Sequence, residues 1–174
     1  MSMRSIHLSC ALALGVAFAL GAGGVSAAQQ TKAPTWITTK GKIVHLTLIA
    51  AYKNVAAGYS FNGYAKGKMT ITVPKGDTVN VTFSNATSLP HSAEITTYTK
   101  TLPTGGVAAA FKGADSPNPA DGVTKGVTQT FSFVASKAGK YLLICAVPGH
   151  AAAGMWDNFG VSSSAKSGSI KTGK

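Results

Sequence analysis

The 174-residue sequence predicts an all-β fold, a Greek-key β-sandwich or barrel of seven to eight strands interrupted by one long irregular insertion. Three observations support this fold class. Short apolar runs recur along the chain, turn residues such as those at 74–77 and 137–139 separate them, and apolar and polar residues alternate within the runs. Val79, Val81 and Phe83, for example, share one side of their run, so this strand has one buried face and one wet face.

Taken in order along the chain, the expected strands begin with 43–51, an alternating apolar run that includes His45. The other expected strands are 69–73, 78–84, 93–98, 128–134, 141–147 and 159–163. Phe131 and Phe133 repeat the alternation in the strand 128–134. The strand 141–147 begins instead with four consecutive apolar residues, which indicates a buried strand.

The first 27 residues are expected to be a signal peptide or a membrane anchor. Arg4 precedes an Ala-rich apolar run at 8–22, and Val25-Ser-Ala27 fits a cleavage site. The apolar stretch 8–25 is also close to the ~20 residues that span a bilayer, so retention as an anchor is the alternative. Cys10 lies in a poor context for lipidation. We therefore expect an exported protein, periplasmic or otherwise extracytoplasmic, either soluble or membrane-tethered.

The rest of the chain is expected to form one domain with two loose ends. Residues 28–40 are interpreted as a linker or a loosely attached N-terminal segment, 41–163 as the domain, and 164–174 as a disordered tail rich in Ser, Gly and Lys. Residues 101–126 are rich in Gly, Ala, Pro and Lys and are too long for an ordinary connection. We interpret them as an insertion that covers one face, forms a docking surface, or is a solvated loop.

The residues with the clearest chemistry lie at the end of the strand 141–147 and directly after it. Cys145, His150 and Met155 lie at five-residue intervals, with Pro148 and Gly149 turning the chain after the cysteine. Two imidazoles, one thiolate and a weak axial thioether are the ligand set of copper electron-transfer sites, because soft sulfur favours Cu(I) and imidazole suits both oxidation states. The sequence block therefore supplies three candidate ligands and lacks one histidine.

Three histidines are candidates for the missing position. His7 lies in the segment expected to be removed, and His45 lies inside a strand. His91 follows a strand-like run and precedes another, in a loop where an imidazole could reach the pole of a sheet. We therefore favour His91 as the fourth ligand.

These residues match a known family: the chain resembles the cupredoxins, or blue copper proteins, and is most similar to the sulfocyanins. The resemblance covers about 61–161 and rests on Phe61-Asn-Gly-Tyr64, Val73-Pro-Lys-Gly76, Val79-Asn-Val-Thr-Phe83, Pro90-His91-Ser92 and the block from Cys145 to Trp156. It implies one copper ion held by His91, Cys145, His150 and Met155. Four residues separate Cys145 from His150 and four separate His150 from Met155, and this spacing is similar to that in sulfocyanin and rusticyanin.

Cysteine usage leaves two other interpretations of Cys145. Once residues 1–27 are removed it is the only cysteine, so an internal disulfide and a dinuclear copper centre with two thiolates are both excluded. A buried inert thiol is one alternative, and a nucleophilic Cys–His site is the other. The presence of His150, Met155 and His91 favours the metal.

Ser92 is expected to tune the cysteine sulfur by hydrogen bonding, and Phe61, Tyr64 and Trp156 to exclude water or simply to fill the core.

Charge indicates the kind of partner. The chain has 16 basic and 5 acidic residues, a formal net charge of +11, which would steer it toward acidic proteins or anionic surfaces. The lysines are scattered and no nucleic-acid reader motif is present, so nucleic acid is not an expected partner. The uncharged sequence 148–154 around His150 predicts an apolar docking patch. The scarcity of carboxylates suits an acidic exterior.

The sequence thus predicts a mononuclear blue copper electron carrier rather than an enzyme, and a monomer. The resemblance implies respiratory redox partners such as a cytochrome and a terminal oxidase, with electrons passing singly by Cu(II)/Cu(I) cycling. A copper storage or delivery protein is the alternative, although Met69 is the only methionine besides Met155 after residue 27. A copper enzyme of the nitrite reductase type would need further histidines, and only His45 is left over.

Overall fold

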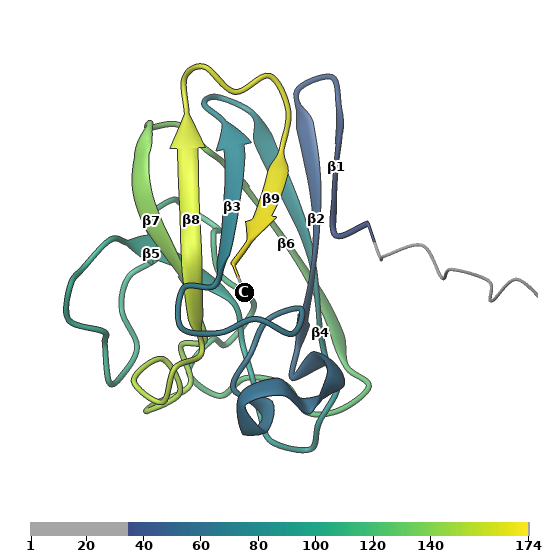
Figure 1. Ribbon diagram of the computed structural model, residues 1–174, viewed down its shortest axis with the longest axis vertical. Coiled ribbons are helices and arrows are strands. Elements are labelled where there is room, and N and C mark those ends of the chain that lie inside the picture. The colour runs from purple at the N-terminus through teal and green to yellow at the C-terminus, as the bar shows by residue number, and fades with distance from the viewer. Residues whose placement is uncertain (1–34, 174) are drawn as a thin grey trace, which may run out of the picture. The chain divides into compact units, whose positions relative to one another are not determined.

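The computed structural model describes residues 35–173, which form nine strands and one short 3-10 helix (Figure 1). The strands are β1 (Ile37–Lys40), β2 (Ile43–Ala50), β3 (Met69–Pro74), β4 (Thr78–Asn85), β5 (Glu94–Thr97), β6 (Thr128–Val134), β7 (Gly139–Ile144), β8 (Trp156–Ser162) and β9 (Ser169–Thr172). The helix η1 spans Tyr52–Gly58. One sheet has the order β1-β2-β4-β6 and the other β5-β7-β8-β3-β9. The predicted all-β sandwich is confirmed.

Side-chain alternation explains why these segments are strands. In β4, Val79, Val81 and Phe83 are buried, as predicted, whereas Thr78, Asn80 and Thr82 lie on the more exposed face. Strand β2 alternates in the same way, and its register with β4 is parallel. All seven predicted strands are present. The apolar faces of the two sheets pack against each other, which places the core between them.

The strands at the two ends of the domain were predicted poorly or not at all from the sequence. The prediction of a disordered tail at 164–174 is wrong for β9, which pairs antiparallel with β3 and places Ile170 against the core. Part of segment 28–40, interpreted as a linker or a loosely attached strand, forms β1, which pairs with β2, so the second of these alternatives is the correct one. Both strands complete a sheet edge through backbone hydrogen bonds, and the polar composition of their sequences does not indicate such pairing. The domain therefore extends beyond 41–163 at both ends.

The insertion 101–126 is not a solvated loop over its whole length. Its middle part runs along β5: the Ile95 N–H donates to the Ala114 carbonyl at 2.8 Å, and the Ala110 N–H donates to the Ile95 carbonyl at 2.8 Å. Phe111 of the insertion stacks on Phe133 of β6 with 5.5 Å between ring centroids. The insertion thus covers the free edge of β5 and closes the sandwich toward β6.

The predicted signal peptide or anchor, residues 1–27, lies outside the described residues. Within 35–173, the structure has no helix of sufficient length and apolar character to cross a membrane.

Candidate metal centre

The segment that connects β7 to β8 is held by backbone hydrogen bonds within it and by one from the Gly149 N–H to the Thr104 carbonyl of the insertion, at 2.9 Å. Cys145 directly follows β7 and is 1% exposed. Its N–H donates to the Met155 carbonyl at 3.1 Å, the Met155 N–H donates to the His150 carbonyl at 3.0 Å, and the His150 N–H donates to the Val147 carbonyl at 3.1 Å. Gly149 occupies the left-handed region at φ 83°, where glycine carries no steric penalty. The connection therefore folds back on itself and returns His150 toward Cys145.

His91 approaches from a different part of the chain and depends on long-range contacts. It lies in the segment before β5, and its backbone exchanges two hydrogen bonds with Val123 of the insertion, at 3.0 and 2.8 Å. The Asn85 side-chain amide donates to the carbonyls of Leu89 and Val123, at 2.7 and 2.6 Å. The end of β4, the His91 segment and the insertion are thereby joined into one support for this imidazole.

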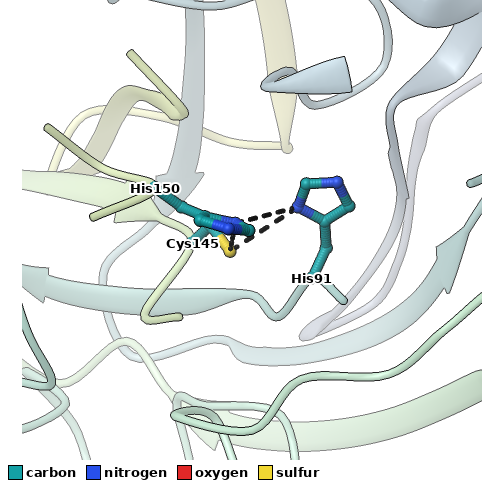
Figure 2. Close-up of side chains that lie close together, drawn as sticks. All are labelled: His91, Cys145 and His150. Carbon is teal, nitrogen blue, oxygen red and sulfur yellow. Dashed lines mark hydrogen bonds between the residues drawn. The ribbon is translucent and has the colours of Figure 1, made fainter. Parts of the chain in front are cut away.

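Three side chains converge at this pole of the sandwich (Figure 2). The Nδ1 atoms of His91 and His150 are 3.2 Å apart, and the Cys145 sulfur lies 3.4 Å from His150 Nδ1 and 3.9 Å from His91 Nδ1. A point equidistant from three atoms at these separations is about 2 Å from each, close to the roughly 2.0 Å and 2.3 Å at which zinc binds imidazole and thiolate. The donor set and its spacing fit a first-row metal ion.

The protonation states also suit a metal. Burial, together with the charge of His150, lowers the pKa of His91 to about 4, and burial lowers the pKa of His150. Both rings are therefore neutral near pH 7, as metal ligation requires. Burial raises the pKa of the Cys145 thiol, which keeps it protonated in the metal-free protein. Metal binding at this site must therefore release the thiol proton.

Ser92 contacts the cysteine sulfur, as the sequence predicted. Its backbone N–H donates to Cys145 Sγ at 3.3 Å, its hydroxyl lies 3.7 Å from the same sulfur, and that hydroxyl accepts from the Ala146 N–H at 3.0 Å. These hydrogen bonds lower the pKa of the thiol and partly oppose the effect of burial. They favour the thiolate that a metal needs.

The other predicted residues are placed as follows. Met155 is fully buried in the same core cluster as Cys145, and its role as a ligand stays a prediction. Phe61 is buried in that cluster and Tyr64 packs against it, whereas Trp156 packs against Leu142, Ile144 and Ala151. His45 lies on the exposed face of β2 and does not belong to the convergent cluster.

Tyr59 is a residue of the site that sequence reasoning missed. Its ring meets the His150 ring edge-on with centroids 5.0 Å apart, and the His91 ring edge-on at 6.2 Å. One aromatic side chain thus packs against both imidazoles. Tyr59 lies 32 positions before His91 in the sequence, and no local pattern connects the two residues.

Comparison with known proteins agrees with this geometry. The family model for the sulfocyanin (SoxE) domain matches residues 30–169. The sulfocyanin of Sulfolobus acidocaldarius is 31% identical over 126 residues, which are 68% of this chain and 63% of that protein. The chain belongs to the sulfocyanin family. Sulfocyanins are blue copper proteins of the cupredoxin class, so the cofactor is one copper ion and the convergent cluster is its site.

Two further proteins are similar to this chain. The rusticyanin of Acidithiobacillus ferrooxidans is 36% identical over 129 residues, 69% of this chain and 77% of that protein. A solved structure of reduced rusticyanin matches with a TM-score of 0.51 at 27% identity, covering 71% of this chain and 82% of that one. The copper-containing nitrite reductase of Neisseria gonorrhoeae is 37% identical over 91 residues, 51% of this chain but 20% of that protein. Family and site together support copper electron transfer.

Proposed function

We propose that the protein is a mononuclear blue copper electron carrier whose ligands are His91, Cys145, His150 and Met155. The observation that carries this proposal is the convergence of two neutral imidazoles and one thiol at 3.2 to 3.9 Å. Bound copper would supply a one-electron couple, Cu(II)/Cu(I). Met155, which is buried beside Cys145 and precedes β8, is the candidate for the weak axial ligand.

The protein's own residues would keep the ligands in one arrangement during oxidation and reduction. The backbone hydrogen bonds of the β7–β8 connection fix Cys145 and His150, and the insertion fixes His91. Ser92 donates to the sulfur and so influences how strongly the thiolate binds. Burial of His91 and Cys145 excludes water from the sulfur. A site held in this way reorganises little, which favours rapid electron transfer.

The partners and the compartment are also proposals. The match covers 63% of the length of the Sulfolobus sulfocyanin, so the partners and the complete activity of this chain are proposals. We propose export to a periplasmic or extracytoplasmic site, with single electrons passing between respiratory partners such as a cytochrome and a terminal oxidase. The excess of basic over acidic residues favours partners with acidic surfaces.

We further propose that the protein is not itself an enzyme. The nitrite reductase match covers 20% of that protein. A second, catalytic copper would need several more histidines, and His45 is the single one left among residues 35–173. Copper storage or delivery is less well supported, because His91 and Cys145 are 0% and 1% exposed and the metal could not be passed on without opening the site.

The decisive experiment is the visible absorption spectrum of the copper-loaded protein, with paramagnetic resonance of the oxidised form. We expect an intense thiolate-to-copper band that bleaches with ascorbate and returns on reoxidation. Cys145→Ser should abolish this band, whereas the control His45→Ala should keep it, because His45 lies on the exposed face of β2. Copper binding without the band, or a Cys145→Ser protein that is still intensely blue, would refute the electron-carrier assignment.

A further inference from the structure

A groove beside the β7–β8 connection is not explained by copper binding. It has a volume of about 350 Å³. Val55, Ala56, Tyr64 and Ala65 supply its apolar walls, and Gly63, Lys66, Lys68 and Gly173 complete its lining. Val55 is 40% exposed, although it is a large apolar residue. The groove is therefore an apolar hollow beside two exposed lysines.

One wall of the groove is bonded directly to the ligand-bearing connection. The Lys66 N–H donates to the Gly154 carbonyl at 3.0 Å, and the Gly67 N–H donates to the Trp156 carbonyl at 3.0 Å. The Lys66 side chain lies over Gly154: a Cβ at that glycine would be 2.8 Å from Lys66 Cε. Gly154 immediately precedes Met155, so a residue that lines the groove is hydrogen-bonded to the neighbour of a candidate copper ligand.

The opposite wall comes from η1, which lies at the same end of the sandwich as the β7–β8 connection (Figure 1). Four of its residues, Lys53, Asn54, Ala56 and Ala57, have φ between 52° and 56°. Left-handed backbone costs an L-residue about 1–2 kcal/mol, and such strain is concentrated at functional sites. Tyr59 directly follows η1, and its ring packs against His91 and His150. Both walls of the groove are therefore formed by segments that also contact the metal centre, one through Gly154 and the other through Tyr59.

Among residues 35–173, the charged side chains that line the groove are of one sign. None of the five acidic residues lines it, and three of them, Asp77, Glu94 and Asp157, are buried. The ion pair that the described residues form joins Lys42 to Asp77, so the ammonium groups of Lys66 and Lys68 have no carboxylate partner in 35–173. Unpaired exposed charges of one sign attract a partner of the opposite sign and raise its association rate.

We infer that this groove docks an acidic segment of the redox partner, with an apolar side chain against Val55 and Ala65 and carboxylates facing Lys66 and Lys68. The inference rests on the proposed electron-carrier function, since it gives the partner a place beside the copper ligands. A second copy of this chain is disfavoured as the occupant by the repulsion of like charges. The groove is distinct from the uncharged patch around His150 that the sequence predicts.

The test uses nuclear magnetic resonance of the ¹⁵N-labelled, copper-loaded protein in the diamagnetic Cu(I) state. The probe is the acetylated peptide Glu-Glu-Leu-Glu-Glu, and Gly-Gly-Leu-Gly-Gly is the neutral control. We expect the acidic peptide to shift the amide signals of Val55, Lys66, Lys68 and Gly173, and the neutral peptide to shift none of them. Raising the salt concentration should weaken the effect, because exposed charges are screened.

Charge-reversal variants make the test specific. The double variant Lys66→Glu with Lys68→Glu should weaken peptide binding about tenfold, whereas Lys137→Glu with Lys140→Glu should weaken it less than about twofold. The control pair makes the same change in net charge, and both of its lysines are exposed at the other end of β7, away from Cys145. Lys66→Gln with Lys68→Gln removes the charges without reversing them and should give an intermediate loss.

Three outcomes would overturn the inference. They are equal losses in the two charge-reversal variants, amide shifts spread over all exposed lysines, and amide shifts in the groove on adding anionic phospholipid vesicles but not the peptide. The first two would indicate a general field effect, and the third a membrane surface. Failure of the proposed function is distinguishable, because it would appear as a missing copper absorption band while leaving the peptide map unchanged.

Discussion

The two segments that bring ligands to the copper site are supported in different ways. Cys145, His150 and Met155 lie within one connection whose internal backbone hydrogen bonds span ten residues or fewer. Its external backbone bonds are the Gly149 N–H donating to the Thr104 carbonyl of the insertion and the Gly154 carbonyl accepting from the Lys66 N–H. His91 is instead fixed by Val123 and Asn85, and through them by an insertion that also covers the edge of β5. Most of the backbone hydrogen bonds that orient the first segment's ligands lie within that segment, whereas the second segment is positioned only when distant parts of the chain assemble.

This difference indicates where the site is vulnerable. A change in the β7–β8 connection acts on the ligands directly. A change at Val123 of the insertion acts on His91 from 32 positions away in sequence, through backbone contacts that do not depend on the chemistry of the copper. Four predictions test this contrast.

The largest effect is expected for Gly122→Ala in the insertion. Gly122 has φ 68°, and a Cβ there would lie 2.8 to 2.9 Å from the backbone of His91. Left-handed strain and the backbone clash together should cost about 2–5 kcal/mol of unfolding free energy and weaken the thiolate-to-copper band. Urea denaturation and the absorption spectrum measure the two effects.

Gly105→Ala, in the same insertion but in open space, should change stability by less than about 0.5 kcal/mol. Equal effects of the two substitutions would contradict the role given to the insertion.

The second prediction concerns the pH dependence of stability and tests Glu94, which lies at the start of β5, three residues after His91. Glu94 is 1% exposed, and burial together with the charge of Asp115 in the insertion raises its pKa from 4.5 to about 7. The folded protein therefore binds more protons than the unfolded chain between these values, so this group's stabilisation is complete below pH 4.5 and is lost as the pH rises to 7. The contribution of Glu94 to the unfolding free energy therefore changes by at most about 3 kcal/mol between these pH values.

Denaturation of the wild-type and Glu94→Gln proteins, both copper-loaded, at pH 4.5 and pH 7.5 measures the share of Glu94. The substitution should reduce the pH dependence without abolishing it, because burial also raises the pKa of Asp157 to about 7 and gives the same trend. Copper must be present, because the lowered pKa values of free His91 and His150 would add the opposite trend. A wild-type protein that is no more stable at pH 4.5, or a variant with an unchanged pH dependence, would show that Glu94 does not titrate in this way.

The third prediction concerns Tyr59, the side chain that contacts ligands from both segments. Tyr59→Leu removes two edge-to-face contacts with imidazoles and should cost about 1–2 kcal/mol of stability. It should also alter the paramagnetic resonance spectrum of the oxidised site, because both rings lose a neighbour that restricts their orientation. Tyr98→Leu is the control, since Tyr98 is 47% exposed. An unchanged resonance spectrum in the Tyr59 variant would show that the ligands are oriented without this ring.

The smallest effect on stability is expected for Met155→Leu. The side chains are similar in volume, so the exchange in the core should cost less than about 1.5 kcal/mol. Copper should stay bound through His91, Cys145 and His150, whereas the reduction potential should change because the axial ligand tunes it. Voltammetry measures this change, and Met69→Leu, a second buried methionine, is the control. Identical potentials in the two variants would remove Met155 from the ligand set.

The sequence by itself determined the fold class and one half of the site. The alternation at β4 and the apolar run before Cys145 are local patterns, and the five-residue intervals from Cys145 to Met155 bring candidate ligands together within one connection. Such signals are readable because strand periodicity and short-range spacing depend on neighbouring residues alone.

Only the tertiary structure decided the rest. It supplied the contacts that bring His91, the histidine that the sequence favoured over His45, beside Cys145; it added β9 to a sheet edge, and it used Tyr59 to cover two ligand rings. It also turned the irregular insertion into the support of His91. These features depend on contacts between residues far apart in sequence. Many of them are backbone hydrogen bonds, which almost any side chain permits and which therefore leave little trace in the order of the amino acids.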